Sequence, residues 1–422
     1  MYLSTIDRSR RDGTRRGPRA TAAAVGTNVL ALGTVSLLTD VSAEMVTAVL
    51  PLYFVLTLQL SPAAYGLMDG LYTGATALLR LVGGYVADRF RRRKTVAAVG
   101  YGISALAKLG LVVAGSSIPA LGAVIVTDRA GKGLRSAPRD ALITLSVSEP
   151  VLGRAFGVHR AMDSMGAFAG PPAALGVLAA VGTTSPAAFN ALFVTSFCVA
   201  AVGLLALAVF ARDRRDERPA ATSVSLRAAA RLLRAAPVRR LLYAAGLLGL
   251  ATVGDGFVYL LLLRRGAVST GWFPLMAVGT NLVYLLLAAP LGAFADRHGR
   301  RTVLLTGYGA LVAVYLLLGS ALPGTPVIIA VLCCYGAFYA ATDGVLMALA
   351  GPLLPADLRT TGLACVQTVQ ALAYFVSSAA FGLAWTTWGT TAATAAAAIA
   401  AVLAVTVTAA VLAGRTPQEA AA

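Results

Sequence analysis

The chain has 422 residues, of which 58% are hydrophobic and only 13% are charged, and its mean hydropathy is +0.77. Soluble globular proteins carry about 25% charged residues, so this composition excludes a water-soluble enzyme, a disordered chain and a collagen-like chain. The net charge of +17 has to be compared with the topology before it is ascribed to nucleic-acid binding. The composition indicates an integral membrane protein.

Apolar segments follow one another along the whole chain. About 20 apolar residues are needed to cross roughly 30 Å of hydrocarbon, and glycine, proline and charged clusters divide the sequence into twelve predicted transmembrane helices. The first six lie near 28–58, 64–87, 95–115, 118–144, 153–182 and 188–211. After a polar stretch, the other six lie near 238–263, 270–296, 302–322, 325–351, 360–384 and 390–413.

Positive charge gathers in alternate connections between these helices. The tail before Thr27 has six arginines, the stretch 212–240 has nine, and further clusters lie at 89–94 and 297–301. The other connections have no lysine or arginine, apart from Arg264 and Arg265 at the end of the seventh predicted helix. Because basic loops remain in the cytoplasm, both termini are predicted to be cytoplasmic. The basic charge is therefore interpreted as a topogenic signal and not as a nucleic-acid footprint.

The polar stretch divides the chain into two halves. The predicted parts are a basic cytoplasmic tail at 1–26, a six-helix bundle at 27–211, a basic cytoplasmic linker at 212–237, a second six-helix bundle at 238–414 and a cytoplasmic tail at 415–422. Within the linker, 225–236 fits either a helix lying on the inner leaflet or a solvated connection. Because each half has an even number of predicted helices, the two halves run parallel, as in many transporters.

A loop motif occurs once in each half. Gly84-Tyr-Val-Ala-Asp88-Arg89 recurs 208 residues later as Gly292-Ala-Phe-Ala-Asp296-Arg297. Extended by the arginines that follow, both copies resemble the Gly-x-x-x-Asp-Arg-x-Gly-Arg-Arg/Lys signature of the major facilitator superfamily, although Arg91 replaces the glycine in the first copy. The resemblance covers essentially the whole chain and implies that these loops latch the cytoplasmic face in one conformation; a topogenic charge cluster is the alternative. The residues expected to act in this gating are Gly84, Asp88, Arg89, Arg92, Arg93, Gly292, Asp296, Arg297, Gly299, Arg300 and Arg301.

The fifth predicted helix carries small residues at a spacing that resembles the antiporter signature of exporters in this superfamily. The residues concerned are Gly157, Gly166, Gly170 and Pro171. Small residues let helices approach closely, and a proline bends the helix. The signature's final glycines are replaced by Ala174 and Leu175. The pattern fits an exporter-like helix or, alternatively, close helix packing alone.

Ionisable residues at membrane depth are the candidates for transport and proton coupling. An ionised group in lipid costs at least ~3 kcal/mol, so several persist together only in pairs or beside a water-filled cavity. The fourth predicted helix is richest in them, with Asp128, Lys132 and Arg135 on one face. Arg129 matches an arginine of the superfamily's exporters, whereas Lys132-Gly133 replaces their Gln-Gly pair. The full set is Asp40, Glu44, Asp128, Arg129, Lys132, Arg135, Arg160, Asp163, Asp255 and Asp343.

The resemblance also implies a central cavity lined by the first, fourth, seventh and tenth helices. This expectation places six of the candidates at the cavity, namely Asp40, Glu44, Arg129, Lys132, Asp255 and Asp343. Static salt bridges between helices are the alternative for any one of them. Arg80 and Lys108 lie nearer to helix ends and are expected to extend toward water.

Taken together, the sequence predicts an all-α integral membrane protein with the major facilitator fold. The expected function is secondary active transport by alternating access, with proton-coupled efflux of a small molecule as the leading hypothesis. A proton symporter for an anionic solute would use Arg129, Lys132 and Arg135 as its clamp. A metal or siderophore exporter, or a membrane receptor that transports nothing, would also fit the sequence.

The expected partners are a small-molecule substrate, protons and the lipid bilayer, but no nucleic acid. No catalytic residue, cofactor or resident metal is expected, because the four cysteines and two histidines lack the spacing of a metal cluster. The protein is expected to be a multi-pass monomer of the bacterial inner (cytoplasmic) membrane.

Overall fold

The computed structural model describes residues 26–90, 93–147, 151–182, 185–213, 234–265, 269–322, 324–354 and 359–413. For 80–90, 137, 153, 351 and 359–361 it describes the backbone alone. Most of the predicted linker and nearly all of both predicted tails lie outside the described residues. In the part of the chain that is described, the secondary structure is entirely helical.

The first half contains six long helices. They are α2 (Thr27–Thr47), α4 (Pro62–Phe90), α5 (Arg93–Val113), α6 (Ile118–Ser146), α7 (Leu152–Val181) and α8 (Pro186–Phe210), with the short α3 (Leu50–Leu52) and η1 (Tyr53–Thr57) continuing α2. Local sequence explains where two of them begin. Ser117 and Ser185 accept hydrogen bonds from the backbone amides of Ala120 and Ala188, and a proline follows in the first turn of each helix. Both are favoured helix starts.

The second half is less regular. Its elements are α10 (Ala236–Leu250), α11 (Asp255–Arg264), η3 (Thr270–Trp272), α12 (Phe273–His298), α13 (Arg300–Gly319), α14 (Thr325–Thr342), α15 (Val345–Ala350), η4 (Gly351–Leu353) and α16 (Arg359–Ala413). The seventh and tenth predicted helices are each interrupted, at 251–254 and at 343–344. The eleventh and twelfth are assigned as one helix that turns sharply at Gly389, whose φ of 82° favours glycine.

Nine helical segments among the described residues are long and apolar enough to cross a membrane. One of them, Gly362–Ala413, spans the turn at Gly389, and α4 and α6 are not among the nine. The prediction of a helical, multi-pass membrane protein is confirmed. The count of twelve spans and the cytoplasmic position of the termini stay predictions.

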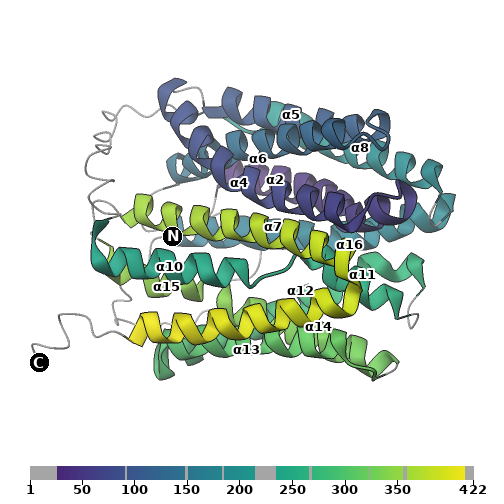
Figure 1. Ribbon diagram of the computed structural model, residues 1–422. Helices are drawn as coiled ribbons and strands as arrows, with labels where there is room; N and C mark the ends of the chain where they lie inside the picture. Colours follow the sequence, from purple (N-terminus) through teal and green to yellow (C-terminus); the bar gives the residue numbers. More distant parts are fainter. Residues whose placement is uncertain are drawn as a thin grey trace, which may run out of the picture.

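The helices of each half pack mainly on one another (Figure 1). In the first half, α2 packs on α7 and α8, and α6 packs on α4 and α5. In the second half, α10 packs on α16, and α12 and α13 pack on α14. The two halves meet where α4 runs along α16 and where α7 contacts α12.

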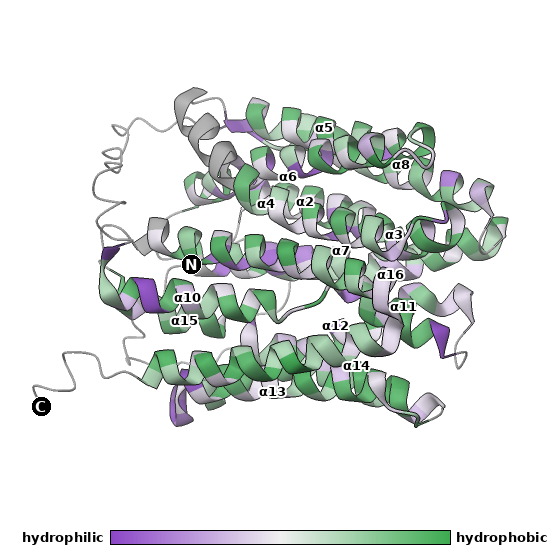
Figure 2. Cartoon of the chain, in the orientation of Figure 1, coloured by the Kyte–Doolittle hydropathy of each residue, from purple (hydrophilic) through white to green (hydrophobic). Residues whose placement is uncertain are grey.

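Polar residues mark one end of the molecule, where α5, α10 and α13 begin, and this end is named the basic end (Figure 2). There Lys94 donates to the carbonyl of Ala208 at 2.8 Å, and Arg301 donates to that of Leu412 at 3.2 Å. These cations satisfy carbonyl groups at the ends of α8 and α16.

The opposite end, where α4, α6 and α8 begin, is named the far end. Arg265 lies there, and its guanidinium donates to the carbonyls of Leu317, Leu318 and Ser320 at 2.6 to 2.9 Å. An arginine that satisfies the last carbonyls of α13 has a structural reason to be at this end. Arg265 therefore departs from the charge pattern because it caps the end of α13.

Candidate functional site

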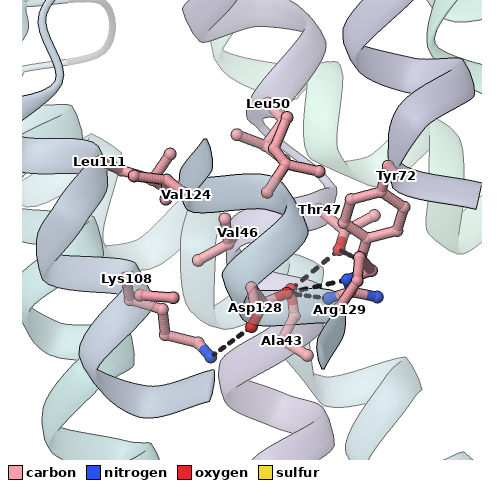
Figure 3. Close-up of a pocket in the computed structure, with 12 residues that line it drawn as sticks. Ala43, Val46, Thr47, Leu50, Tyr72, Lys108, Leu111, Val124, Asp128 and Arg129 are labelled. Carbon is pink, nitrogen blue, oxygen red and sulfur yellow. Dashed lines mark hydrogen bonds and ion pairs between the residues drawn. The ribbon is translucent and has the colours of Figure 1, made fainter. Parts of the chain in front are cut away.

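One network of buried charges lies between α5 and α6 (Figure 3). The Asp128 carboxylate accepts a hydrogen bond from Ser104 at 2.5 Å, lies 3.8 Å from the Lys108 Nζ, and is bound by Arg129 through Nε at 2.9 Å. The guanidinium of Arg129 also stacks 3.8 Å above the ring of Tyr72 on α4. The expectation that Lys108 extends to water is wrong: it is 5% exposed, because the Asp128 charge compensates its burial.

A second network joins α2, α6 and α7. Arg135 lies 3.5 Å from Asp40 and its guanidinium sits 4.6 Å from the centre of the Tyr101 ring. One turn further along α6, Arg139 contacts Asp140 at 3.0 Å and Asp163 at 3.7 Å. These contacts fasten α6 to α2 and α7.

Four members of this second network, namely Ser36, Arg139, Asp140 and His159, were not candidates from sequence, and one candidate is peripheral to it. Arg139 donates to Ser36 at 3.2 Å, and Ser36 in turn is 2.9 Å from the Nε2 atom of His159. The spacing of four residues from Arg135 could have identified Arg139, since i and i+4 share a helix face. Arg160 has a 78% exposed side chain that only reaches Asp163 at 3.9 Å.

A cavity of about 300 Å³ lies between α4, α6 and the first part of α16. Its lining side chains are polar or small: Tyr72, Thr73, Thr76, Ala77, Arg129, Lys132, Ala364, Gln367, Thr368 and Ala371. Both halves of the chain contribute to these walls. Of the helices expected to line a central cavity, only the fourth, α6, contributes to this one. The expected lining of a central cavity by the first, fourth, seventh and tenth helices stays a prediction.

Glu44 and Lys132 differ from the other central charges. Among the described residues, neither side chain makes a hydrogen bond or an ion pair within 4 Å. Lys132 lies at the cavity wall, whereas Glu44 is not among the residues that line this cavity. Each of the two groups is thus left without a close partner among the described residues.

The remaining acids of the candidate set lie apart from the cavity. Asp255 begins α11 directly after the interrupted segment and accepts hydrogen bonds from Tyr335, at 2.6 Å, and from Tyr339. Asp343 is exposed at the interruption after α14 and accepts a hydrogen bond from Tyr284 at 3.0 Å. The structure does not bring Asp343 to the other central charges.

One acid at membrane depth was not among the candidates from sequence. Asp69 of α4 accepts hydrogen bonds from Tyr374 at 3.1 Å and from Ser378 at 2.6 Å, both on α16. Its position inside the second predicted helix meets the same criterion that selected the other acids, so the signal was present in the sequence.

The small residues of α7 face α2 only in part. A side chain at Gly166 would meet the backbone of Leu37, and one at Gly170 would lie 2.9 Å from the carbonyl oxygen of Val41. Pro171 is buried next to Gly170, whereas Gly157 faces open space. Two of the glycines therefore have a packing role.

In the second loop motif, Asp296 accepts hydrogen bonds from Arg300 at 2.9 and 3.1 Å, and Arg300 also donates to the carbonyl of Ala348 at 2.7 Å. Gly299 between the two helices has a φ of 99°, which favours glycine. Gly292 faces open space. In the first motif, Arg93 begins α5, while the side chains of Gly84, Asp88, Arg89 and Arg92 lie outside the described residues.

Comparison with known sequences gives one family for almost the whole chain. The sequence profile described as Major Facilitator Superfamily matches residues 32–272 and 265–422. An uncharacterised MFS-type transporter of Methanocaldococcus jannaschii is 30% identical over 370 residues, which are 85% of this chain and 88% of that protein. An uncharacterised protein of Mycobacterium tuberculosis is 31% identical over 286 residues, which are 65% of this chain and 67% of that protein.

Solved structures of transporters share the fold. The nucleoside transporter NupG matches with a TM-score of 0.77 at 14% identity, over 92% of this chain and 100% of that one. A D-xylose-proton symporter matches with a TM-score of 0.69 at 16% identity, over 90% of this chain and 96% of that one. At such low identities the likeness extends to the fold and not to the substrate.

Proposed function

The chain belongs to the major facilitator superfamily, and from that premise we propose that it is a secondary active transporter that carries a small anionic solute together with protons. The observation that carries the proposal is the cavity of about 300 Å³, whose lining residues include Arg129 and Lys132 and no acid. A cation at the wall of a cavity inside the membrane attracts a negatively charged solute, because the surrounding dielectric is low.

The two cations at the cavity wall differ in what binds them. Arg129 is bound to Asp128, which also faces Lys108. Lys132 makes no ion pair within 4 Å with any described residue, although it lines the cavity. A bound anion would give Lys132 the partner that it lacks.

Glu44 supplies a route for proton coupling in this proposal. While Glu44 is ionised, its charge competes with an anion for Lys132. A proton on Glu44 removes that competition, so proton and anion strengthen each other's binding, and this linkage is reciprocal. Cooperative binding of the two ligands suits movement in the same direction, so the geometry favours the symporter hypothesis over proton-driven efflux.

The small residues of α7 were an argument for efflux, because their spacing resembles the antiporter signature of exporters. The packing of Gly166 and Gly170 on the α2 backbone accounts for these residues without any bearing on direction. We therefore propose uptake by symport as the main function, with efflux as the alternative that a flux measurement separates from it. We also propose that the basic end is cytoplasmic and that the protein spans the membrane twelve times.

A binding screen with matched pairs of compounds tests the anion proposal. Two pairs join an anion to its neutral analogue, namely gluconate with glucose and glucose 6-phosphate with glucose. Succinate, lactate and inorganic phosphate are tested as further anions. The melting temperature of the purified protein is measured with each compound at pH 5.5 and pH 8. We expect at least one anion to stabilise the protein, more at pH 5.5, and its neutral analogue to have no effect.

Lys132→Gln is expected to abolish this stabilisation. Arg239→Gln makes the same change of charge at an exposed position of the basic end and should respond like the wild type. An equal response of wild type and Lys132→Gln, or stabilisation by neutral compounds alone, would overturn the proposal.

A further inference from the structure

Asp69 lies on the contact between the two halves at the far end. It belongs to α4 in the first half, and its carboxylate accepts hydrogen bonds from Tyr374 and Ser378 of α16 in the second half, at 3.1 and 2.6 Å. Tyr65, one turn earlier on α4, lies 3.5 Å away. Figure 1 shows α4 and α16 running side by side. At the far end of the molecule, α11 lies beside the part of α16 where that helix turns (Figure 1). Any movement that opens the far end has to break the hydrogen bonds between Asp69 and α16.

The backbones around Asp69 approach closely. A side chain at Gly70 would lie 2.8 Å from the carbonyl oxygen of Phe375, and one at Gly382 would meet the carbonyl of Pro62. Nearer still to the end of the helices, the amide of Ala63 donates to Thr386 at 3.0 Å. The far end is therefore closed by direct contact of α4 with α16, and Asp69 is an ionisable group inside this contact.

The residue before a second acid lies against Asp69 from the other half. A side chain at Gly254 would meet Asp69 and would lie 2.9 Å from the Tyr374 hydroxyl. The next residue is Asp255, which is bound by the two tyrosines of α14, Tyr335 and Tyr339.

No described residue makes an ion pair with Asp69 or Asp255. On the α6 side, Arg129 stacks on Tyr72, one turn of α4 closer to the basic end, and is already bound to Asp128. The closed far end thus holds Asp69 among hydroxyl groups and next to Gly254, the residue before Asp255. Neither acid has a cation as a partner among the described residues.

We propose that Asp69 closes the far end in its protonated form and that loss of its proton opens the far end. Two ionised carboxylates in this contact repel each other, and separating the halves moves Asp69 away from Asp255 and into water. With a proton on Asp69, the repulsion vanishes while Tyr374 and Ser378 still find an acceptor oxygen. Closure is thus stabilised at low pH and lost as the pH rises. The proposal rests on the proton-coupled function above and adds Asp69 as the group whose protonation responds to pH at the far end.

Distance measurements between spin labels test the proposal without any substrate. The labels are attached to Ser116→Cys and Thr387→Cys, two exposed positions of the far end in opposite halves, in full-length protein whose four native cysteines are replaced by alanine. In the otherwise wild-type chain, the population with the longer distance should grow between pH 5 and pH 9. The ratio of open to closed protein should change by up to about tenfold per pH unit, the limit for one released proton.

Asp69→Asn keeps the shape and an acceptor oxygen but no charge, so the short distance should persist at every pH. Asp255→Asn removes the repelling partner and should flatten the response in the same way. Tyr374→Phe combined with Ser378→Ala removes the donors and should increase the open population throughout. Asp213→Asn, an exposed acid next to the end of α8, should respond like the wild type.

An unchanged pH response in Asp69→Asn, or equal distances at pH 5 and pH 9 in the wild-type background, would overturn the proposal. Neither result depends on anion binding, so the failure of this inference and the failure of the proposed substrate class are separate outcomes.

Discussion

Charged side chains at membrane depth persist when each has a compensating group. Lys108, Arg129 and Arg135 follow that rule, because each has an acid within 4 Å. Lys132 has no such partner among the described residues, and neither has Glu44. An unpaired base at the wall of a cavity is an arrangement that a bound anion can complete.

The first prediction concerns Glu44. If the Glu44 charge competes with the solute for Lys132, then the affinity for the stabilising anion falls as the pH rises in the wild type. Glu44→Gln removes the competing charge, so its affinity should equal that of the wild type at low pH and vary less than about twofold between pH 5.5 and pH 8. Isothermal titration calorimetry with that anion measures both. An identical pH dependence in the two proteins would exclude Glu44 as the coupled group.

The second prediction concerns Arg129. Its guanidinium donates to Asp128 through Nε and lies over the Tyr72 ring. A lysine has neither the several hydrogen-bond donors in one plane nor the flat group that can lie over a ring. Arg129→Lys should therefore lower the initial transport rate at least about tenfold in protein that still inserts. Tyr72→Phe keeps the ring and loses only the hydroxyl that contacts Thr47 at 2.8 Å, so it should retain most activity. A fully active Arg129→Lys would show that charge alone matters.

Residue types at the site could be predicted from the sequence, but their pairings could not. Charged residues in apolar segments identified Asp40, Asp128 and Lys132. The partners, however, come from distant helices: Arg135 is 95 residues from Asp40, and Ser378 is 309 residues from Asp69. Such pairings depend on how the helices pack, which a single sequence does not determine.

At the scale of elements, α7 and α2 form one of the tightest contacts of the first half. Gly166 and Gly170 face the α2 backbone, while Gly157 and Gly176 face open space. The glycine spacing therefore combines two positions that need a glycine for packing with two that do not.

The third prediction separates these two kinds of glycine. Gly170→Ala places a methyl group 2.9 Å from the Val41 carbonyl oxygen, so it should lower the free energy of unfolding by about 1–3 kcal/mol, the usual cost of overpacking. Gly176→Ala meets nothing within 4 Å and should be neutral or slightly stabilising, because alanine favours helix more than glycine does. Thermal unfolding of the two purified variants measures the difference. Equal melting temperatures would contradict the packing role of Gly170.

The interrupted helices show what the sequence could not reveal at this scale. The seventh predicted helix carries a charge at membrane depth only at Asp255, yet the structure breaks it before that residue, at 251–254. The freed backbone groups are satisfied by Tyr315 of α13, which donates to the Ala251 carbonyl and accepts from the Val253 amide, each at 2.9 Å. Irregular backbone within a membrane protein needs such partners. Because Tyr315 lies more than 60 residues away in sequence, the local pattern alone predicts a continuous helix.

At the scale of the whole molecule, the two halves meet along α4 with α16 and α7 with α12. The repeated loop motif and the apolar segments were enough to predict a helical membrane protein of this superfamily, because both are encoded locally in each half. Contacts between the halves are not encoded locally. The sequence therefore could have identified Asp69 as an acid at membrane depth, but not its partners Tyr374 and Ser378 on α16.

The fourth prediction concerns the loop motif of the second half. Asp296 holds Arg300, which also binds the carbonyl of Ala348 and so links the start of α13 to α15. If this link acts in conformational switching, Asp296→Asn should reduce turnover at least about tenfold and leave the anion affinity within a few-fold. Transport rates and binding constants of the same preparation measure both. Normal turnover in Asp296→Asn would remove the latch role.

The central claim is that an anion and a proton move together through this protein. The most direct test records the internal pH of vesicles that contain the purified protein and a trapped pH-sensitive dye. The stabilising anion is added outside at equal pH on both sides, with the membrane potential clamped by potassium and valinomycin. We predict that the vesicle interior becomes more acidic in the wild type, that it changes little with Lys132→Gln, and that the neutral analogue has no effect. A more alkaline interior on addition of the anion would show exchange of anion for proton, and an unchanged internal pH despite measured anion uptake would show transport without proton coupling; either result would contradict the coupled movement of anion and proton.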